Sequence, residues 1–166
     1  GLAVELVYER GQFVVGSTRG DGVNGENITQ NLRTIKTIPL QLIRKEIPVP
    51  ERLEVRGEVI MQLNKFKFLN QKREEMGEPP FANPRNAAAG SVRQLDSKIT
   101  SARPLEIYCY GLGEVIGRTF KTHSEILQTC PKWGLRTNPY IQRCQNIDEV
   151  LEYYHKMNVK RETLPY

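Results

Sequence analysis

The sequence predicts an α+β fold with largely antiparallel sheets and flanking helices. Two observations support this prediction. The chain opens with two short alternating apolar–polar segments joined by a tight turn, which is typical of a β-hairpin. Beyond it, segments with the two-residue period of strands are interleaved with segments whose apolar residues recur at helical spacing. The 166 residues suffice for one domain with a sizeable core.

The first expected element is a β-hairpin over residues 2–18. Apolar residues alternate with their neighbours along its first strand, at Leu2, Val4, Leu6 and Tyr8. The pair Arg10-Gly11 supplies a tight turn into a second strand that ends at Thr18. A glycine-rich loop is expected to follow at residues 20–25.

Helical and strand patterns then alternate. A short helix is expected over residues 28–35, where apolar residues fall at helical spacing, and it ends before Pro39. Residues 53–61 alternate strongly and predict a strand. A helix from about 64–76 is expected to end at Gly77, because glycine commonly terminates helices.

The second half of the chain continues in the same way. Residues 78–86 contain three prolines and are expected to form a loop. Residues 87–95 predict a short helix, residues 105–111 predict a strand, and a further helix is expected to begin near Ser124.

The last expected helix carries a capping signature. Asn146 is the expected N-cap, and Glu149 follows three residues later, as in a capping box. Val150, Leu151 and Tyr154 share one side of this helix, and we expect that side to face the core.

Composition excludes several classes of protein. Lysine and arginine outnumber acidic residues 24 to 19, giving a net charge of +5 and a pI near 9.2. This excess favours polyanionic partners, although many proteins without such partners are equally basic. No apolar run approaches the roughly 20 residues of a membrane helix, so we expect a cytoplasmic protein without membrane contact.

The cysteines give no sign of a disulfide framework or a zinc site. Cys109, Cys130 and Cys144 are odd in number and far apart, and they contain no C-x-x-C pair. We therefore expect buried, reduced thiols and assign no metal ligand.

The strand over residues 53–61 places three charged side chains on one face, at Glu54, Arg56 and Glu58. Two interpretations remain open. The face is either solvated, or it is the floor of a polar site at which Gly57 lets a ligand or another chain approach closely.

Two further residues are candidates for contacts with a nucleotide. Arg19 ends a strand beside glycines, where it can reach a phosphate; an ordinary turn with a solvated arginine is the alternative. Tyr110 shares a strand face with Glu106 and Tyr108, and it can stack on a nucleobase or belong to the core or its rim.

The segment 81–94 has an unusual composition. Three alanines and Gly90 leave almost no side-chain bulk, and Arg85 and Arg93 flank them about two helical turns apart. Such a surface suits a sugar-phosphate backbone. A tightly packed helix contact with two surface arginines is the alternative.

Together these segments resemble the bacterial NAD-dependent DNA ligases. "TRGDGVNGENITQNLRTI", "LEVRGEV" and "FANPRNAAAGSVRQLD" occur in the order found in that family, and the likeness covers nearly all of residues 1–166. The third segment is very specific, whereas "TRGDG" alone is weak. The resemblance implies the nucleotidyltransferase fold that DNA ligases share with mRNA capping enzymes.

The resemblance also implies where this chain lies in the ligase. Gly1 matches the last residue of the family motif K-x-D-G, so the lysine that becomes adenylated is expected three residues upstream, with later motifs downstream of Tyr166. Residues 1–166 are then the central part of an adenylation domain, truncated at both ends. Because no catalytic residue lies in this chain, we expect the fragment alone to be inactive.

The family roles carry over to six positions. Arg19, Glu58 and Tyr110 match nucleotide-binding positions, with Glu58 on the ribose and Tyr110 on the adenine. Basic positions linked to the nick and its 5′-phosphate match Arg85, Arg93 and Arg161. The intact enzyme uses NAD and Mg²⁺ to seal nicked duplex DNA in replication and repair, through lysyl-AMP and DNA-adenylate intermediates.

Two other functions remain open from the sequence. One is an ATP-dependent ligase or a capping-type nucleotidyltransferase of the same superfamily, against which the alanine-rich arginine segment argues. The other is a non-catalytic module that binds nucleic acid through its basic patches.

Overall fold

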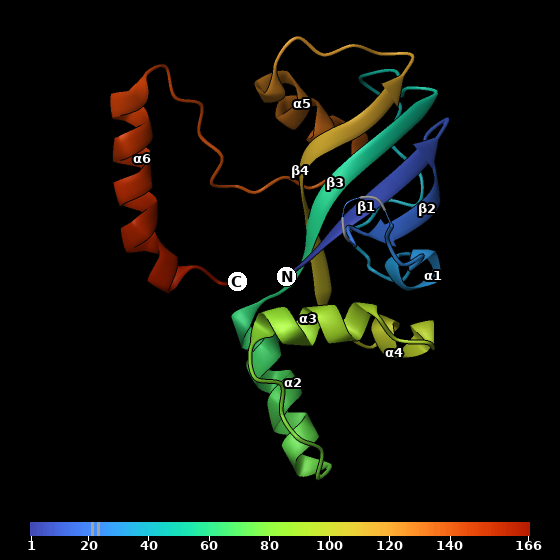
Figure 1. Ribbon diagram of the computed structural model, residues 1–166, viewed down its shortest axis with the longest axis vertical. Coiled ribbons are helices and arrows are strands. Elements are labelled where there is room, and N and C mark those ends of the chain that lie inside the picture. The colour runs from blue at the N-terminus through green and yellow to red at the C-terminus, as the bar shows by residue number, and fades with distance from the viewer. Residues whose placement is uncertain (21, 23) are drawn as a thin grey trace.

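The computed structural model describes all residues except Asp21 and Val23, which belong to the loop expected at residues 20–25. A four-stranded sheet with strand order β2-β1-β3-β4 forms the centre of the molecule, and helices flank it (Figure 1). Each neighbouring pair of strands is antiparallel. The predicted α+β class with an antiparallel sheet is therefore confirmed.

The predicted hairpin is formed by β1 (Leu2–Glu9) and β2 (Gln12–Thr18). Arg10 and Gly11 have φ values of 48° and 80°. Positive φ at both central residues is what a two-residue type I′ turn requires, and this turn matches the twist of the two strands. This confirms the tight turn expected at Arg10-Gly11.

The central strand is β3 (Arg52–Met61), and its other neighbour is β4 (Leu105–Ile116). β4 continues five residues beyond the expected end at residue 111. It does so because Leu53 pairs with Val115 and Arg52 with Ile116. The extension is thus stabilised by pairing with the start of β3, which the local sequence pattern does not reveal.

The described part of the chain contains eight helical segments. They are α1 (Thr29–Leu32), α2 (Leu63–Glu75), α3 (Pro84–Val92), α4 (Ser97–Ser101), α5 (His123–Thr129), η1 (Cys130–Trp133), α6 (Ile147–Lys160) and η2 (Arg161–Thr163). α3 begins three residues before the expected start, because the Asn83 side chain caps it by accepting from the Asn86 N–H, and Pro84 fits the first turn. α1 is shorter than expected, and α4 was not predicted.

The core lies on the apolar face of the sheet. Every residue of the predicted inner face of β3 is buried: Leu53, Val55, Gly57, Val59 and Met61. A Cβ atom at Gly57 would lie 2.7 Å from the Ile107 Cδ1 atom. The close approach that this glycine permits is therefore made by the neighbouring strand, which does not support the alternative in which a ligand approaches at Gly57.

The alanine-rich helix α3 packs inward, mostly against β3. Ala87 and Ala88 are completely buried, whereas Ala89 and Gly90 are half-buried. The smooth surface expected for a DNA backbone is therefore largely used by the protein itself. The alternative of a tight helix contact, with arginines at the surface, describes this segment better.

α6 has the predicted cap but not the predicted orientation. The Asn146 side chain accepts from the Glu149 N–H, as expected. Val150, Leu151 and Tyr154 are 45%, 49% and 62% exposed, so the expectation that they face the core is wrong. In Figure 1 this helix lies apart from the sheet, and none of its residues, all of which are described, is buried.

Two of the three thiols behave as expected. Cys109 and Cys130 are buried and free, and burial raises the pKa of Cys109 to about 12 and that of Cys130 to about 11. Cys144 differs from the expectation because it is only half-buried. None of the described helices is long and apolar enough to cross a membrane.

Candidate functional site

The polar face of the sheet brings two predicted site residues, Glu58 and Arg19, into one row. Ala3 of β1 pairs with Glu58 of β3, and Glu58 pairs with Tyr108 of β4. Directly paired residues point to the same face of a sheet. Arg19 lies at the end of the row, because its backbone N–H donates to the Ala3 carbonyl oxygen at 3.1 Å.

A β-bulge sets the position of Tyr110. Arg56 pairs with Gly111 and Gly57 pairs with Cys109, which leaves Tyr110 as the extra residue of β4. A bulge redirects a side chain and is frequent beside active sites. Tyr110 is 46% exposed and therefore presents its ring outward, as a stacking role requires.

A pocket of about 740 Å³, the first pocket, opens beside this row. Three residues predicted from the sequence, Glu58, Arg85 and Tyr110, line it together with Gly1 and Tyr108. The Gly1 amino nitrogen lies 4.0 Å from Glu58 Oε1. The volume suits a small-molecule ligand.

A second part of the wall of the first pocket was not predicted. His123 and Leu127 of α5 line it, together with Asn138, Ile141 and Tyr166. Asn138 Nδ2 donates to the Tyr166 hydroxyl at 2.7 Å, and the Tyr166 and Tyr108 ring centroids are 5.4 Å apart. These residues come from separate segments without a motif, so only the tertiary structure reveals them.

The buried carboxylate of Glu106 lies on β4 close to Tyr108, which lines the first pocket. Glu106 accepts hydrogen bonds from Gln62 at 3.0 Å, Lys65 at 2.9 Å and Arg136 at 3.1 Å. Burial alone would raise the Glu106 pKa, but Lys65 and Arg136 outweigh it and hold the pKa below its usual value. Arg136 also lies over the Tyr108 ring at 5.7 Å, so this cluster connects α2 to the pocket wall.

Arg19 lines a different pocket from Glu58. This second pocket, of about 470 Å³, lies on the same face of the sheet, and its lining includes Arg19, Arg56 and Glu5. Tyr110 lines both pockets and thus stands between them. The structure therefore brings all three residues expected to contact a nucleotide to adjoining pockets.

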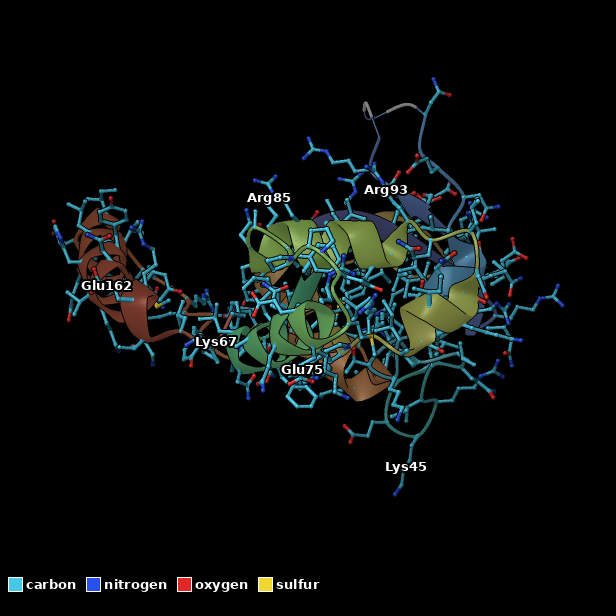
Figure 2. The ribbon with its side chains drawn as sticks, turned by 90° about the horizontal axis from the view of Figure 1, so that it is seen from below. Lys45, Lys67, Glu75, Arg85, Arg93 and Glu162 are labelled. Carbon is cyan, nitrogen blue, oxygen red and sulfur yellow. The ribbon has the colours of Figure 1, made fainter. Side chains whose placement is uncertain are left out.

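The three arginines expected to contact DNA are not all together. Arg85 in α3 and Arg93, the residue that follows α3, are both exposed, and Figure 2 shows them on the same side of the molecule. Arg93 Nε forms an ion pair with Glu26 Oε2 at 2.8 Å. Arg161 is exposed at the start of η2, whose next residue, Glu162, lies at the far end of the molecule in Figure 2.

Comparison with known proteins identifies the family. The model of the NAD-dependent DNA ligase adenylation domain matches residues 1–166. The chain is 62% identical to a DNA ligase of Geotalea uraniireducens, 60% identical to one of Geobacter sulfurreducens and 54% identical to one of Salinibacter ruber. Each match covers 100% of this chain and 24% of the relative, so the chain spans about a quarter of their length. The chain belongs to the NAD-dependent DNA ligase adenylation domain family.

Proposed function

We propose that residues 1–166 are the central part of the adenylation domain of an NAD-dependent DNA ligase that acts in the cytoplasm. The enzyme would seal nicks in duplex DNA, in replication and repair, through lysyl-AMP and DNA-adenylate intermediates. One observation carries the proposal beyond family membership: Glu58 and Tyr110 line one pocket of about 740 Å³, with Arg19 in the pocket beside it.

Each of these side chains has chemistry that suits a dinucleotide substrate. The Tyr110 ring is exposed and can stack on adenine. The Glu58 carboxylate is 41% exposed and can accept hydrogen bonds from ribose hydroxyls. Arg19 can bind a phosphate through its guanidinium group. In the family resemblance the nucleophilic lysine precedes Gly1, and Gly1 itself lines the first pocket.

The reaction would transfer AMP from NAD to that lysine, releasing nicotinamide mononucleotide, and then to the 5′-phosphate of the nick. Attack of the 3′-hydroxyl on that phosphate would release AMP and seal the strand. This chain's residues would position the nucleotide and place positive charge near the transferring phosphoryl group, which is how phosphoryl transfer is commonly catalysed. Mg²⁺ belongs to the proposal for the intact enzyme. The described residues contain no group of three or more potential metal ligands, so we assign no metal-binding residue.

The test is a full-length graft, namely the Geotalea uraniireducens ligase with its matching segment replaced by residues 1–166. The graft is expected to form an enzyme-bound adenylate from labelled NAD and to seal a nicked duplex, as the unaltered ligase does. Label on protein and ligated product on a denaturing gel are the measurements. A graft that folds and binds nicked DNA but forms no adenylate would favour a non-catalytic binding module instead.

Arg85→Ala and Arg93→Ala in this graft are each expected to weaken binding to nicked DNA by the same factor for any nick sequence. Phosphate contacts do not depend on base sequence. Each lost contact should flatten the plot of log affinity against log salt by about 0.9. Binding measured at several salt concentrations gives this slope.

Glu26→Gln is the matched control. It removes the carboxylate that pairs with Arg93, so we expect it to strengthen DNA binding rather than weaken it. If the slopes for Arg85→Ala and Arg93→Ala both equal that of the unsubstituted graft, these residues do not contact DNA.

A further inference from the structure

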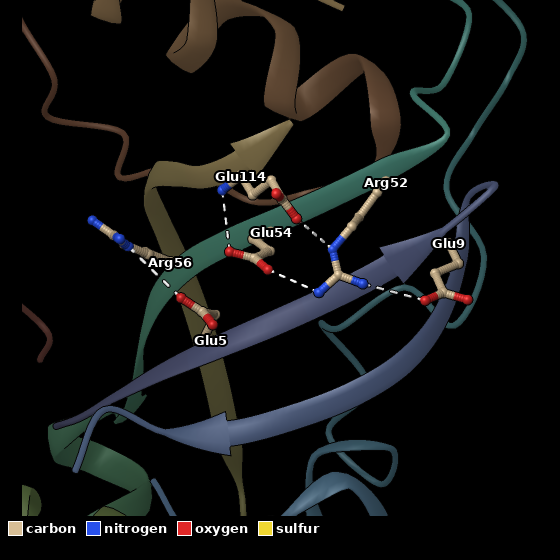
Figure 3. Close-up of polar contacts among 6 residues, drawn as sticks. All are labelled: Glu5, Glu9, Arg52, Glu54, Arg56 and Glu114. Atoms are coloured by element: carbon tan, nitrogen blue, oxygen red, sulfur yellow. Dashed lines mark hydrogen bonds and ion pairs between the residues drawn. The ribbon is translucent and has the colours of Figure 1, made fainter. Parts of the chain in front are cut away.

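Two arginines on the polar face of β3 have very different surroundings (Figure 3). Arg52 contacts three carboxylates, those of Glu9 at 3.3 Å, Glu54 at 2.9 Å and Glu114 at 2.8 Å. These acids lie on β1, β3 and β4, so the Arg52 guanidinium group connects three strands. Its two terminal nitrogens hydrogen-bond to Glu9 and Glu54, and its Nε forms an ion pair with Glu114, so the group is committed to the protein itself.

Arg56, four residues further along the same face of β3, makes few contacts with the protein. Its one polar side-chain partner among the described residues is Glu5, whose Oε2 atom lies 3.8 Å from Arg56 Nε. That contact leaves both terminal nitrogens of the guanidinium group without a partner in the described chain. The side chain is 56% exposed, and Figure 3 shows it pointing away from the Arg52 cluster.

Arg56 opens into the second pocket, where a second arginine is also available. Arg19 lines the same pocket, and its described contacts involve its backbone rather than its guanidinium group. Glu5 is the one carboxylate among the described lining residues, so within the described part of the pocket two positive charges face one negative charge. The backbone of Gly22 and Gly25 also borders the pocket and adds no side-chain bulk.

We propose that Arg56, together with Arg19, forms a phosphate-binding subsite beside the first pocket. A guanidinium fork with free terminal nitrogens binds two phosphate oxygens at once. Tyr110 lies between the two pockets, so a nucleotide stacked on it would have its neighbouring phosphate within reach of the second pocket. The subsite rests on the proposed function, and the phosphate would come from the second nucleotide of NAD or from nicked DNA.

The test compares Arg56→Gln with Arg52→Gln in the full-length graft. Arg56→Gln is expected to leave the melting temperature unchanged and to weaken equilibrium binding of its ligand by roughly tenfold, the usual effect of one lost charged hydrogen bond. Arg52→Gln is expected to lower the melting temperature and to leave ligand affinity unchanged. Arg56→Lys keeps the charge but not the fork, so it should recover only part of the affinity.

Separate binding measurements with NAD and with nicked duplex identify the source of the phosphate. Weaker binding of NAD without DNA assigns the subsite to the dinucleotide. Weaker binding of nicked duplex, with a salt slope smaller by about 0.9, assigns it to a DNA phosphate. Unchanged affinity for both ligands in Arg56→Gln would overturn the subsite. Because binding is measured at equilibrium, this result is distinct from a graft that forms no adenylate, which would count against the proposed function.

Discussion

Replacing Trp133 with alanine is expected to destabilise the chain by about 3–5 kcal/mol, as large-to-small changes of buried aromatic residues do. Trp133 is completely buried, and its ring meets that of Phe120 edge-on with centroids 6.2 Å apart. Its carbonyl oxygen also accepts from the Ile43 N–H at 3.0 Å. The alanine variant would leave a cavity between η1 and these segments.

Denaturant unfolding of the 166-residue chain, followed by circular dichroism, measures this loss. Trp133 is the one tryptophan in the sequence, so its fluorescence gives an independent record of unfolding in the unsubstituted chain. Trp133→Phe is the control. The Trp133 Nε1 atom has no hydrogen-bond partner among the described residues. Replacement by phenylalanine therefore removes side-chain volume but no hydrogen bond. A loss for Trp133→Ala no larger than that for Trp133→Phe would contradict the expectation.

The sheet could be predicted from the sequence because its pattern is local. The side chains of a strand alternate between two faces, so the buried face of β3 and its charged face both follow from residues 53–61 alone. The turn at Arg10-Gly11 likewise depends on neighbouring residues. For the same reason, Glu58 could be placed on a polar face before its neighbours were known.

Features that depend on distant partners could not be predicted in this way. The spacing of apolar residues in α6 predicts a helix with one apolar and one polar side. It does not predict which part of the protein packs on the apolar side, and Leu151 and Tyr154 are in fact exposed. Small residues in α3 indicate a close approach, but the sequence does not distinguish DNA from β3, against which Ala87 and Ala88 pack. The wall formed by Asn138 and Tyr166 depends on a contact across 28 residues.

Glu58→Ala in the full-length graft is expected to slow formation of the enzyme adenylate by about 10- to 150-fold, the effect of losing a hydrogen bond to a charged group. The Glu58 carboxylate lines the first pocket, and no described side chain forms a hydrogen bond or ion pair with it. Because it makes so few contacts with the protein, its removal should hardly change the melting temperature. Single-turnover labelling with NAD, normalised to folded protein, measures the rate.

Glu54→Gln provides the matched control on the same strand and the same face. Its carboxylate is bound by Arg52 at 2.9 Å and by the Glu114 N–H at 3.1 Å, away from the lining of either pocket. We expect this variant to lose some stability and to form the adenylate at the normal rate per folded molecule. The opposite pattern for Glu58→Ala, early melting with a normal rate per folded molecule, would make Glu58 a structural residue and remove it from the nucleotide site.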